Sequence, residues 1–284
     1  MILLSIVLVL ILEWYFRVSP SYRSFRWFLR FRGFIHRQFP AQFDHLGGLF
    51  LILGVPAILL ALLFGWSDSH AAIVARVIVG GLLLWYCLGP KDLRSVLAGY
   101  LAALERDDSQ GAYEHLHDTL PIDGVDDLSQ MGRNVTHYVL TEINTRFIAV
   151  IFWFAVLGPA AALFYRLCTL YGDVLKLEPG HPHGPLLRKV RHVLDWIPAR
   201  LTALSYAFVG DFVRGYSALH PFWREANASS EKILSESGLA ALAVAADVPD
   251  DVLDENLQAL ALAERALLFF LVLIAVISIF GLLI

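Results

Sequence analysis

The sequence predicts an all-α fold, that of a polytopic helical integral membrane protein. Of its 284 residues, 57% are hydrophobic and 17% are charged, and the mean hydropathy is +0.61. This composition is too apolar for an ordinary soluble domain. No segment alternates steadily between apolar and polar residues, as a half-exposed β-strand would. Four apolar runs approach the length of about 20 residues that a helix needs to cross a bilayer, and they cover residues 46–65, 71–89, 147–167 and 266–284.

We expect a single membrane domain, in which shorter amphipathic or partly inserted helices accompany about four spans. The first two runs are joined by only a few residues, so they should form a helical hairpin. Pro56 and Pro159 are expected to kink their helices. Whether residues 1–13 and 195–212 cross the bilayer stays open. In order, the expected parts are a basic and aromatic N-terminal region (1–45), the hairpin (46–89), a cytoplasmic helical segment (90–146), a kinked span with the helix after it (147–212), a further helical segment (213–265) and the C-terminal span (266–284).

The distribution of arginine and lysine predicts the orientation. Basic residues are frequent in the segments before and after the hairpin, and its short connecting loop has none. Because basic residues favour the cytoplasmic side, residues 14–45 and 90–146 are placed in the cytoplasm and the hairpin tip outside. The side of residues 168–265 stays open, because a full crossing by 147–167 would put several basic residues outside. These are Lys176, Arg188, Lys189 and Arg191.

The segment 17–39 interleaves arginine with phenylalanine, tryptophan and tyrosine. This pattern is typical of anchoring at a lipid surface, with rings at the headgroup level and guanidinium groups toward anionic lipid. An active-site role for these arginines is the less favoured alternative. The lipid bilayer is therefore the first expected partner. A formal net charge of −4 argues against nucleic acid.

The segment 195–212 is the strongest candidate for a functional site, because it is an apolar helix that contains ionisable residues. On a helical wheel Asp195, Thr202 and Tyr206 share one face. Asp195 should cap the start of this helix, and Pro198 fits near a helix start. Arg200 lies inside the apolar run, so it needs an anionic partner, and an ion pair and an anion-binding site both stay open. We expect Asp211 near the far end of the helix, beside a basic neighbour such as Arg214.

A second pair of charged residues lies earlier in the chain. Glu142 and Arg146 are four residues apart, which first predicts a helix-stabilising ion pair. We expect the 195–212 helix to pack against 147–167 and to form a polar pocket. The residues predicted to bind a ligand are Arg200, Glu142, Asp195, Arg146, Thr202 and Tyr206.

No cofactor, metal site or catalytic residue is predicted. His181 and His183 could share a metal only if their loop folded around it, and a solvated loop is favoured. The sequence contains no glycine-rich phosphate loop, serine nucleophile elbow or HExxH motif. Cys87 and Cys168 lie in apolar runs and are expected to be buried thiols.

Several stretches resemble one membrane superfamily, the AmpE and CobD/CbiB group. The segments "LGPKDLR", "FIAVIFWFAVLGPAAALFYR" and "DWIPARLTAL" occur in the order of that group, over residues 82 to 210. The N-terminal "LVLILEWYFRVSPSYRSFRWFL" resembles AmpE in particular. The CobD/CbiB members are synthases of cobalamin assembly, with an acidic cluster before the "FW" segment and paired acids before "IPARL". Here those positions hold mostly neutral or basic residues, namely His137, Thr141, Glu142, Thr145 and Arg146, and then Arg191 and His192.

The resemblance therefore implies a protein that keeps the scaffold and lacks much of the synthase chemistry. AmpE members are inner-membrane signalling modulators or sensory transducers linked to the induction of chromosomal β-lactamase. The resemblance implies that role here, without catalysis and with a protein partner in cell-wall recycling signalling. Two alternatives stay open: a membrane enzyme of the cobinamide-phosphate synthase type, and a binding or transport module for a small anionic ligand.

Overall fold

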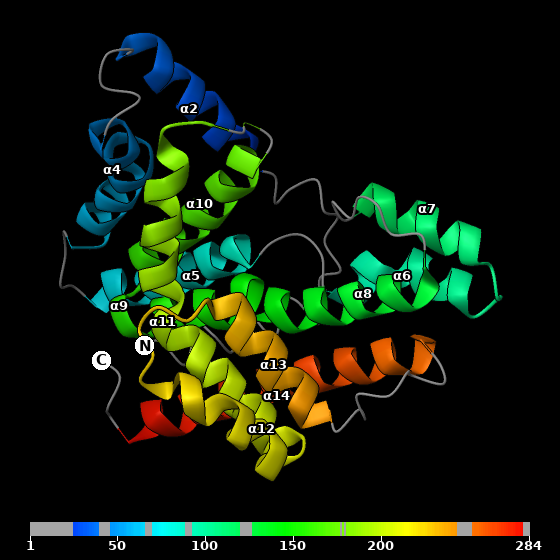
Figure 1. The fold of residues 1–284 in the computed structure, drawn as a ribbon. Coiled ribbons are helices and arrows are strands. Elements are labelled where there is room, and N and C mark those ends of the chain that lie inside the picture. The colour runs from blue at the N-terminus through cyan, green and yellow to red at the C-terminus, as the bar shows by residue number, and fades with distance from the viewer. Residues whose placement is uncertain are drawn as a thin grey trace. The chain divides into compact units, whose positions relative to one another are not determined.

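The part of the chain that the structure describes is predominantly helical. The structure is a computed structural model that describes residues 25–39, 46–65, 70–88, 93–119, 127–176, 178, 180–242 and 252–280 (Figure 1). No strand occurs within these ranges. The predicted all-α class is therefore confirmed. The apolar residues 1–13 and the hairpin tip at 66–69 lie outside the described residues.

By its internal contacts the chain divides into two compact units. Unit 1 comprises residues 1–90, 145–195 and 273–284, and unit 2 comprises 91–144 and 196–272. The borders at 144–145, 195–196 and 272–273 fall inside continuous helical segments, and each unit is assembled from segments that are distant in sequence. We expect both units to belong to a single membrane domain, and this stays a prediction.

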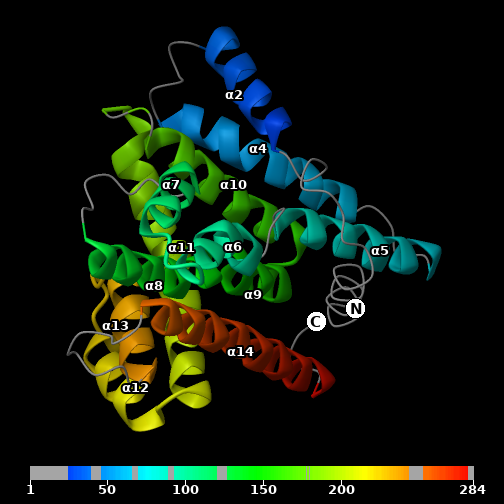
Figure 2. The same ribbon diagram turned by 90° about the vertical axis from the view of Figure 1, so that its right-hand side faces the viewer.

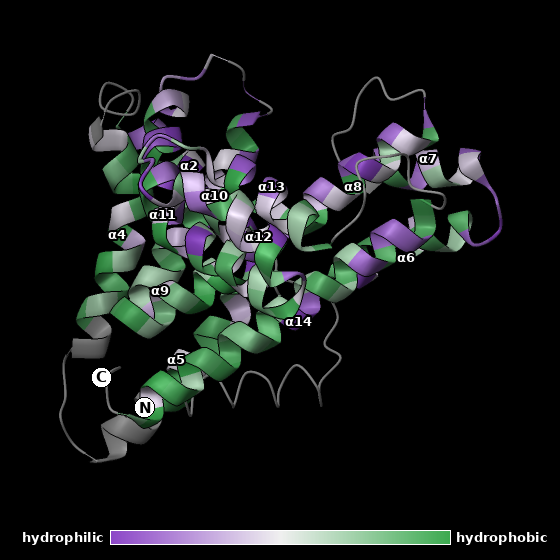
Figure 3. Ribbon diagram, turned by 60° about the horizontal axis from the view of Figure 1, so that its bottom comes forward, coloured by the Kyte–Doolittle hydropathy of each residue, from purple (hydrophilic) through white to green (hydrophobic). Residues whose placement is uncertain are grey.

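Unit 1 is built around α10 (Pro159–Lys176), which packs against α4 (Leu46–Gly65), α5 (His70–Cys87) and α9 (Ala149–Leu157). The amphipathic α2 (Arg26–Gln38) lies on α4, as Figure 2 shows. The two helices α4 and α5 match the expected hairpin runs closely. Apolar residues dominate along α5 and α9 (Figure 3). The first part of α11 (His183–Val209) also belongs to this unit.

The apolar run 147–167 is divided between two helices. Gly158 ends α9 with a φ of 84°, a conformation that favours glycine. Pro159 then occupies the first position of α10, where its missing N–H costs nothing. The kink expected at Pro159 is thus a complete break between two helices.

Two helices in the described part are long and apolar enough to cross a membrane. They are Leu128–Leu157, which joins α8 (Leu128–Ile143), a π-helix (Asn144–Ile148) and α9, and Val252–Ile279, which is α14. Shorter apolar stretches cover 47–62, 77–87 and 93–104. The expected number of four spans is therefore not confirmed.

Unit 2 consists of helices that pack in pairs. The short α12 (Phe212–Leu219) packs against α13 (Ser230–Leu242), and α13 packs against α8. In the same unit α6 (Leu93–Leu104) packs against α7 (Ser109–Thr119) and α8. A 3-10 helix, η3 (His220–Trp223), follows α12. One apolar cluster of the unit contains Ala203, Leu219, Phe222, Ala228 and Ile233.

The turn from α11 to α12 brings two backbones close together. Asp211 N–H donates to the carbonyl of Ala241 at 2.8 Å, and a Cβ on the neighbouring Gly210 would lie 2.4 Å from that same oxygen. Asp211 is the N-cap of α12, where it accepts a hydrogen bond from Arg214 N–H at 3.0 Å. The expected neighbour Arg214 is confirmed. Asp211, however, begins the next helix, and a negative charge is favourable there.

Candidate functional site

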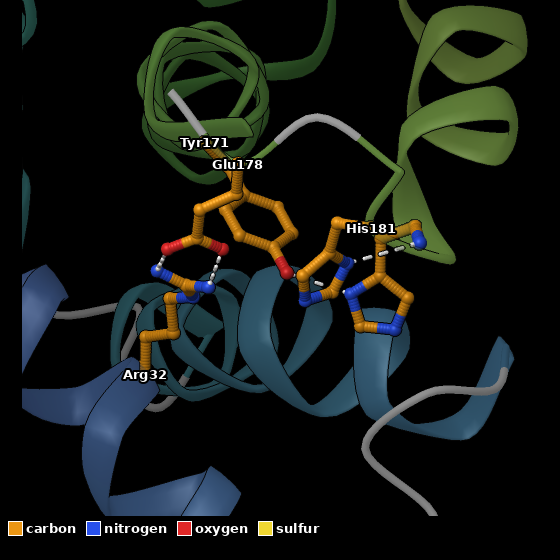
Figure 4. A network of polar contacts seen from close by, with 5 residues as sticks. Arg32, Tyr171, Glu178 and His181 are labelled. Atoms are coloured by element: carbon orange, nitrogen blue, oxygen red, sulfur yellow. Dashed lines mark hydrogen bonds and ion pairs between the residues drawn. The ribbon is translucent and has the colours of Figure 1, made fainter. Parts of the chain in front are cut away.

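The connection between α10 and α11 holds a polar network that reaches back to α2. Arg32 of α2 donates two hydrogen bonds to the carboxylate of Glu178, one of them 2.9 Å long from Nη1 to Oε1 (Figure 4). The Arg32 guanidinium also lies 5.5 Å from the centre of the Tyr171 ring. The hydrogen bonds from Arg32 hold the pKa of Glu178 below its ordinary value of 4.5. This pair fixes α2 to the end of α10.

The two histidines of the same connection are built into this network. The Tyr171 hydroxyl shares a 2.6 Å hydrogen bond with Nδ1 of His183, whose side chain is buried. The N–H of His183 donates to Nδ1 of His181 at 3.2 Å. The expectation of a solvated loop is therefore wrong for His183, because it begins α11 and faces Tyr171. Within the described residues no three His, Cys, Asp or Glu side chains gather as a metal site.

Asp195 does not cap a helix, because α11 begins twelve residues earlier at His183. Its carboxylate is buried and accepts a hydrogen bond from the hydroxyl of Tyr165 at 2.6 Å. Burial of a carboxylate is unfavourable unless such a partner is present. Asp195 is thus a mid-helix residue held against α10, which confirms that the start of 195–212 packs against 147–167.

Pro198 explains a further contact between α11 and the run 147–167. A proline inside a helix has no N–H, so the carbonyl four residues earlier, that of Leu194, loses its helical donor. The indole N–H of Trp153 donates to this carbonyl at 3.2 Å. Trp153 therefore replaces the hydrogen bond that Pro198 removes.

This replacement can be tested with a double-mutant cycle. Trp153→Phe should lower the free energy of unfolding by about 1–2 kcal/mol more in the native background than in a Pro198→Ala background, because an alanine at this position can supply the missing donor. Thermal unfolding in detergent measures both differences. Equal costs in the two backgrounds would show that the Trp153 hydrogen bond is unrelated to Pro198.

Arg200 is almost completely buried, with 4% of its surface exposed, and its hydrogen bonds go to backbone carbonyls. Nη1 donates to Trp196 O at 2.8 Å, and Nη2 donates to Phe222 O at 2.9 Å and Glu225 O at 2.7 Å. The guanidinium lies 4.1 Å from the centre of the Trp196 ring, which is a cation–π contact. An acidic side chain or a bound anion was expected. The carbonyls at the end of η3 take that place, since a helix C-terminus carries partial negative charge.

Thr202 and Tyr206 meet the end of α8. The Tyr206 hydroxyl donates to Leu140 O at 2.6 Å, and both side chains are buried. Thr202 Oγ1 lies 2.9 Å from Asn144 Oδ1 and 2.9 Å from Pro198 O. Asn144 begins the π-helix, and such segments are frequent at functional sites. Asn144 could not be predicted as a site residue, because a π-helix has no simple sequence pattern.

Glu142 and Arg146 lie on either side of the point where α8 gives way to the π-helix. Both side chains are partly buried. The i, i+4 spacing that predicts an ion pair assumes α-helical geometry, and a π-helix changes that spacing. Their pairing and their role in ligand binding stay predictions.

An open polar groove of about 480 Å³ lies between α8 and the start of α13. Hydroxyl, amide and imidazole groups dominate its lining, together with one acidic and one basic side chain. The lining residues are Asn134, His137, Tyr138, Thr141, Ser229, Glu231, Lys232 and Ser235. This lining suits a small polar ligand.

A buried polar network that was not predicted from the sequence joins α6, α8 and α14. Asn256 Nδ2 donates to Gly132 O and to Thr136 Oγ1, both at 2.9 Å, and the Tyr100 hydroxyl donates to Asn256 Oδ1 at 2.8 Å. Thr136 Oγ1 lies 3.1 Å from the carboxylate of the buried Glu255. The sequence contains one signal of this network. Asn256 lies four residues before Leu260, so this polar residue falls on the apolar stripe of α14.

The fold and the buried polar contacts together indicate the class of this protein. In the described part the secondary structure is helical, two helices can cross a membrane, and several buried polar side chains are hydrogen-bonded within the protein. That combination is typical of helical membrane proteins.

Comparison with known proteins identifies the family. The model of the family "Regulatory signalling modulator protein AmpE" matches residues 1–284, and the chain belongs to this family. It is 26% identical to Protein AmpE of Shigella flexneri over 291 residues, which cover 99% of both chains.

Two cobalamin biosynthesis proteins are similar over part of the chain. CobD of Chromobacterium violaceum is 28% identical over 176 residues, 58% of this chain and 55% of that protein. CobD of Pelobacter propionicus is 26% identical over 155 residues, 52% of this chain and 47% of that protein. The chain thus matches about half the length of each CobD protein. No solved structure matches the chain significantly.

Proposed function

We propose that this protein is a multi-pass inner-membrane signalling modulator of the cell-wall and β-lactamase-induction response. The match of the AmpE family model to residues 1–284 is the observation on which the proposal rests. The protein is proposed to act by binding, with no cofactor and with a protein partner in cell-wall recycling signalling. The open polar groove of about 480 Å³ between α8 and the start of α13 supports a binding role.

The ligand is proposed to be small and polar or anionic. The predicted ligand-binding residues stay proposals for each unit by itself, namely Arg200, Thr202, Tyr206 and Glu142 in unit 2, and Asp195 and Arg146 in unit 1. Of these residues, Glu142 lies next to the polar groove beside α8, because the adjacent Thr141 lines that groove. We therefore propose that the ligand binds near Glu142. Lys232 supplies a positive charge there.

Induction of β-lactamase tests the signalling role. In a host with an inducible chromosomal β-lactamase and no family member of its own, expression of this chain should change the β-lactamase activity measured after exposure to a β-lactam. Thr141→Ala combined with Lys232→Gln should abolish the change, whereas Gln110→Ala on the exposed face of α7 should not. An induction level that does not respond to the wild-type chain would contradict the proposal.

The similarity to the CobD proteins supports a second candidate, a membrane synthase of cobalamin assembly. We expect no such activity, because Thr145, Arg191 and His192 stand where the synthases tend to carry acids. Growth of a synthase-deficient strain on cobyric acid measures it directly. Rescue by this chain would establish the synthase function and remove the non-catalytic proposal.

A further inference from the structure

The helix α2 has an inner face that holds it to the rest of unit 1. Phe28 and Ile35 are buried, with 1% and 5% of their surfaces exposed, and Arg32 is turned toward Glu178. These residues follow the i, i+4, i+7 spacing of one helix face. The ring of Phe28 packs edge-on against Tyr171, with 6.2 Å between the ring centres. The inner face is thus fully engaged.

The outer face of α2 combines a row of arginines with an aromatic ridge. Arg26, Arg30 and Arg37 are exposed and fall within about 40° of one another around the helix axis. Beside them Trp27 and Phe34 are 39% and 58% exposed and lie within about 20° of each other. The helix contains no aspartate or glutamate. The outer face therefore carries only positive charge next to an uncovered apolar strip.

Contacts within unit 1 place this outer face at the end of an apolar helix. The indole N–H of Trp27 donates to the hydroxyl of Tyr86 at 3.0 Å. The ring of Phe25 packs on the same tyrosine, with 4.5 Å between the two ring centres. Tyr86 is the penultimate residue of α5, whose last part, 77–87, is apolar. Tryptophan and tyrosine gather in this way where apolar helices meet the headgroup region of a bilayer.

We propose that the outer face of α2 docks onto the phosphate headgroups of anionic phospholipids. A guanidinium group can donate two parallel hydrogen bonds to the oxygens of one phosphate. The row of Arg26, Arg30 and Arg37 therefore matches a layer of negative headgroups. Trp27 and Phe34 enter the boundary between headgroups and acyl chains. Arg32 takes no part, because Glu178 already holds its guanidinium. The binding surface is independent of the proposed signalling role.

Lipid retention measures the charge recognition directly. The full chain is purified in detergent, exposed to equal amounts of phosphatidylglycerol and phosphatidylcholine, and the retained lipids are counted by native mass spectrometry. The wild type should prefer phosphatidylglycerol, and Arg26→Gln, Arg30→Gln and Arg37→Gln together should reduce this preference about tenfold. The matched control is Arg106→Gln, Arg133→Gln and Arg224→Gln, three exposed arginines of unit 2.

The control separates a specific surface from net charge. It removes the same number of charges and should change the preference by less than about twofold. Equal losses in both triple variants would overturn the proposal. Both triple variants retain Arg32, so α2 should stay in place, and thermal unfolding in detergent checks this.

A second measurement locates the ridge without changing any arginine. A bimane label at Gln38→Cys, exposed on the Trp27 side of α2, is compared in nanodiscs with one at Gln110→Cys on α7, while the native cysteines are buried. Brominated phosphatidylglycerol should quench the Gln38→Cys label more strongly. A Gln38→Cys label reached only by aqueous iodide, or shielded from both quenchers by a protein partner or a second copy, would overturn the proposal.

Discussion

Replacing Arg200 by methionine should destabilise the protein strongly. Methionine keeps much of the volume beside Trp196 but has no donors, so the carbonyls of Phe222 and Glu225 lose charge-assisted hydrogen bonds of 2.9 and 2.7 Å. The expected loss in the free energy of unfolding is about 4 kcal/mol, given about 1.5–3 kcal/mol for each hydrogen bond to a charged group. Thermal unfolding in detergent measures it.

Arg200→Lys provides the matched comparison. Lysine keeps the charge, but its single ammonium group lacks the planar fork that reaches several carbonyls at once. It should recover about half of the lost stability. If Arg200 serves mainly as a site for an anionic ligand, Arg200→Met should instead unfold at the wild-type temperature and lose only signalling.

The second large effect is expected at the turn between α11 and α12. Gly210→Ala would place a Cβ 2.4 Å from the carbonyl oxygen of Ala241, far inside van der Waals contact. The backbone at Gly210 cannot move away from Ala241 freely, because Asp211 N–H donates a hydrogen bond to that same oxygen. We expect a loss of about 3 kcal/mol and a decrease in Tm on the order of 10 °C.

Gly33→Ala is the control for this substitution. Gly33 lies inside α2, and an added Cβ there would meet nothing within 4 Å. Alanine should stabilise that helix by about 0.5–1 kcal/mol, because glycine has the larger conformational freedom when unfolded. Equal stability of Gly210→Ala and the wild type would show that the turn before α12 can move away from Ala241 without cost.

The sequence predicts the helical class well, because the length and apolar character of the runs determine it. The boundaries of α4 and α5 follow directly from residues 46–65 and 71–89. Pro159 predicts a kink in 147–167, whereas Gly158 and Pro159 together break this run into two helices. Hydropathy averages over such a pair and does not detect a break in backbone direction.

The candidate site was harder to predict, because its partners are distant in sequence. The apolar surroundings of Arg200 in the sequence predict a buried cation with an anionic partner, and its burial is confirmed. Backbone carbonyls, however, have no sequence signature, so the end of η3 could not be foreseen as that partner. Asp195 was assigned as a cap because Pro198 resembles a helix start, whereas Trp153 allows proline inside α11. Arg32 and Glu178 are 146 residues apart, and only the fold brings them together.

The break at Gly158 sets where a membrane crossing has to end. Leu128–Leu157 is one of the two described helices that can cross a membrane, and it stops directly before Gly158. The helix α10 begins at the break and carries Arg166, Asp173 and Lys176, and it is not one of those two helices. It packs instead against α9. The apolar run 147–167 therefore supplies the end of one helix able to cross and the start of another that packs within unit 1.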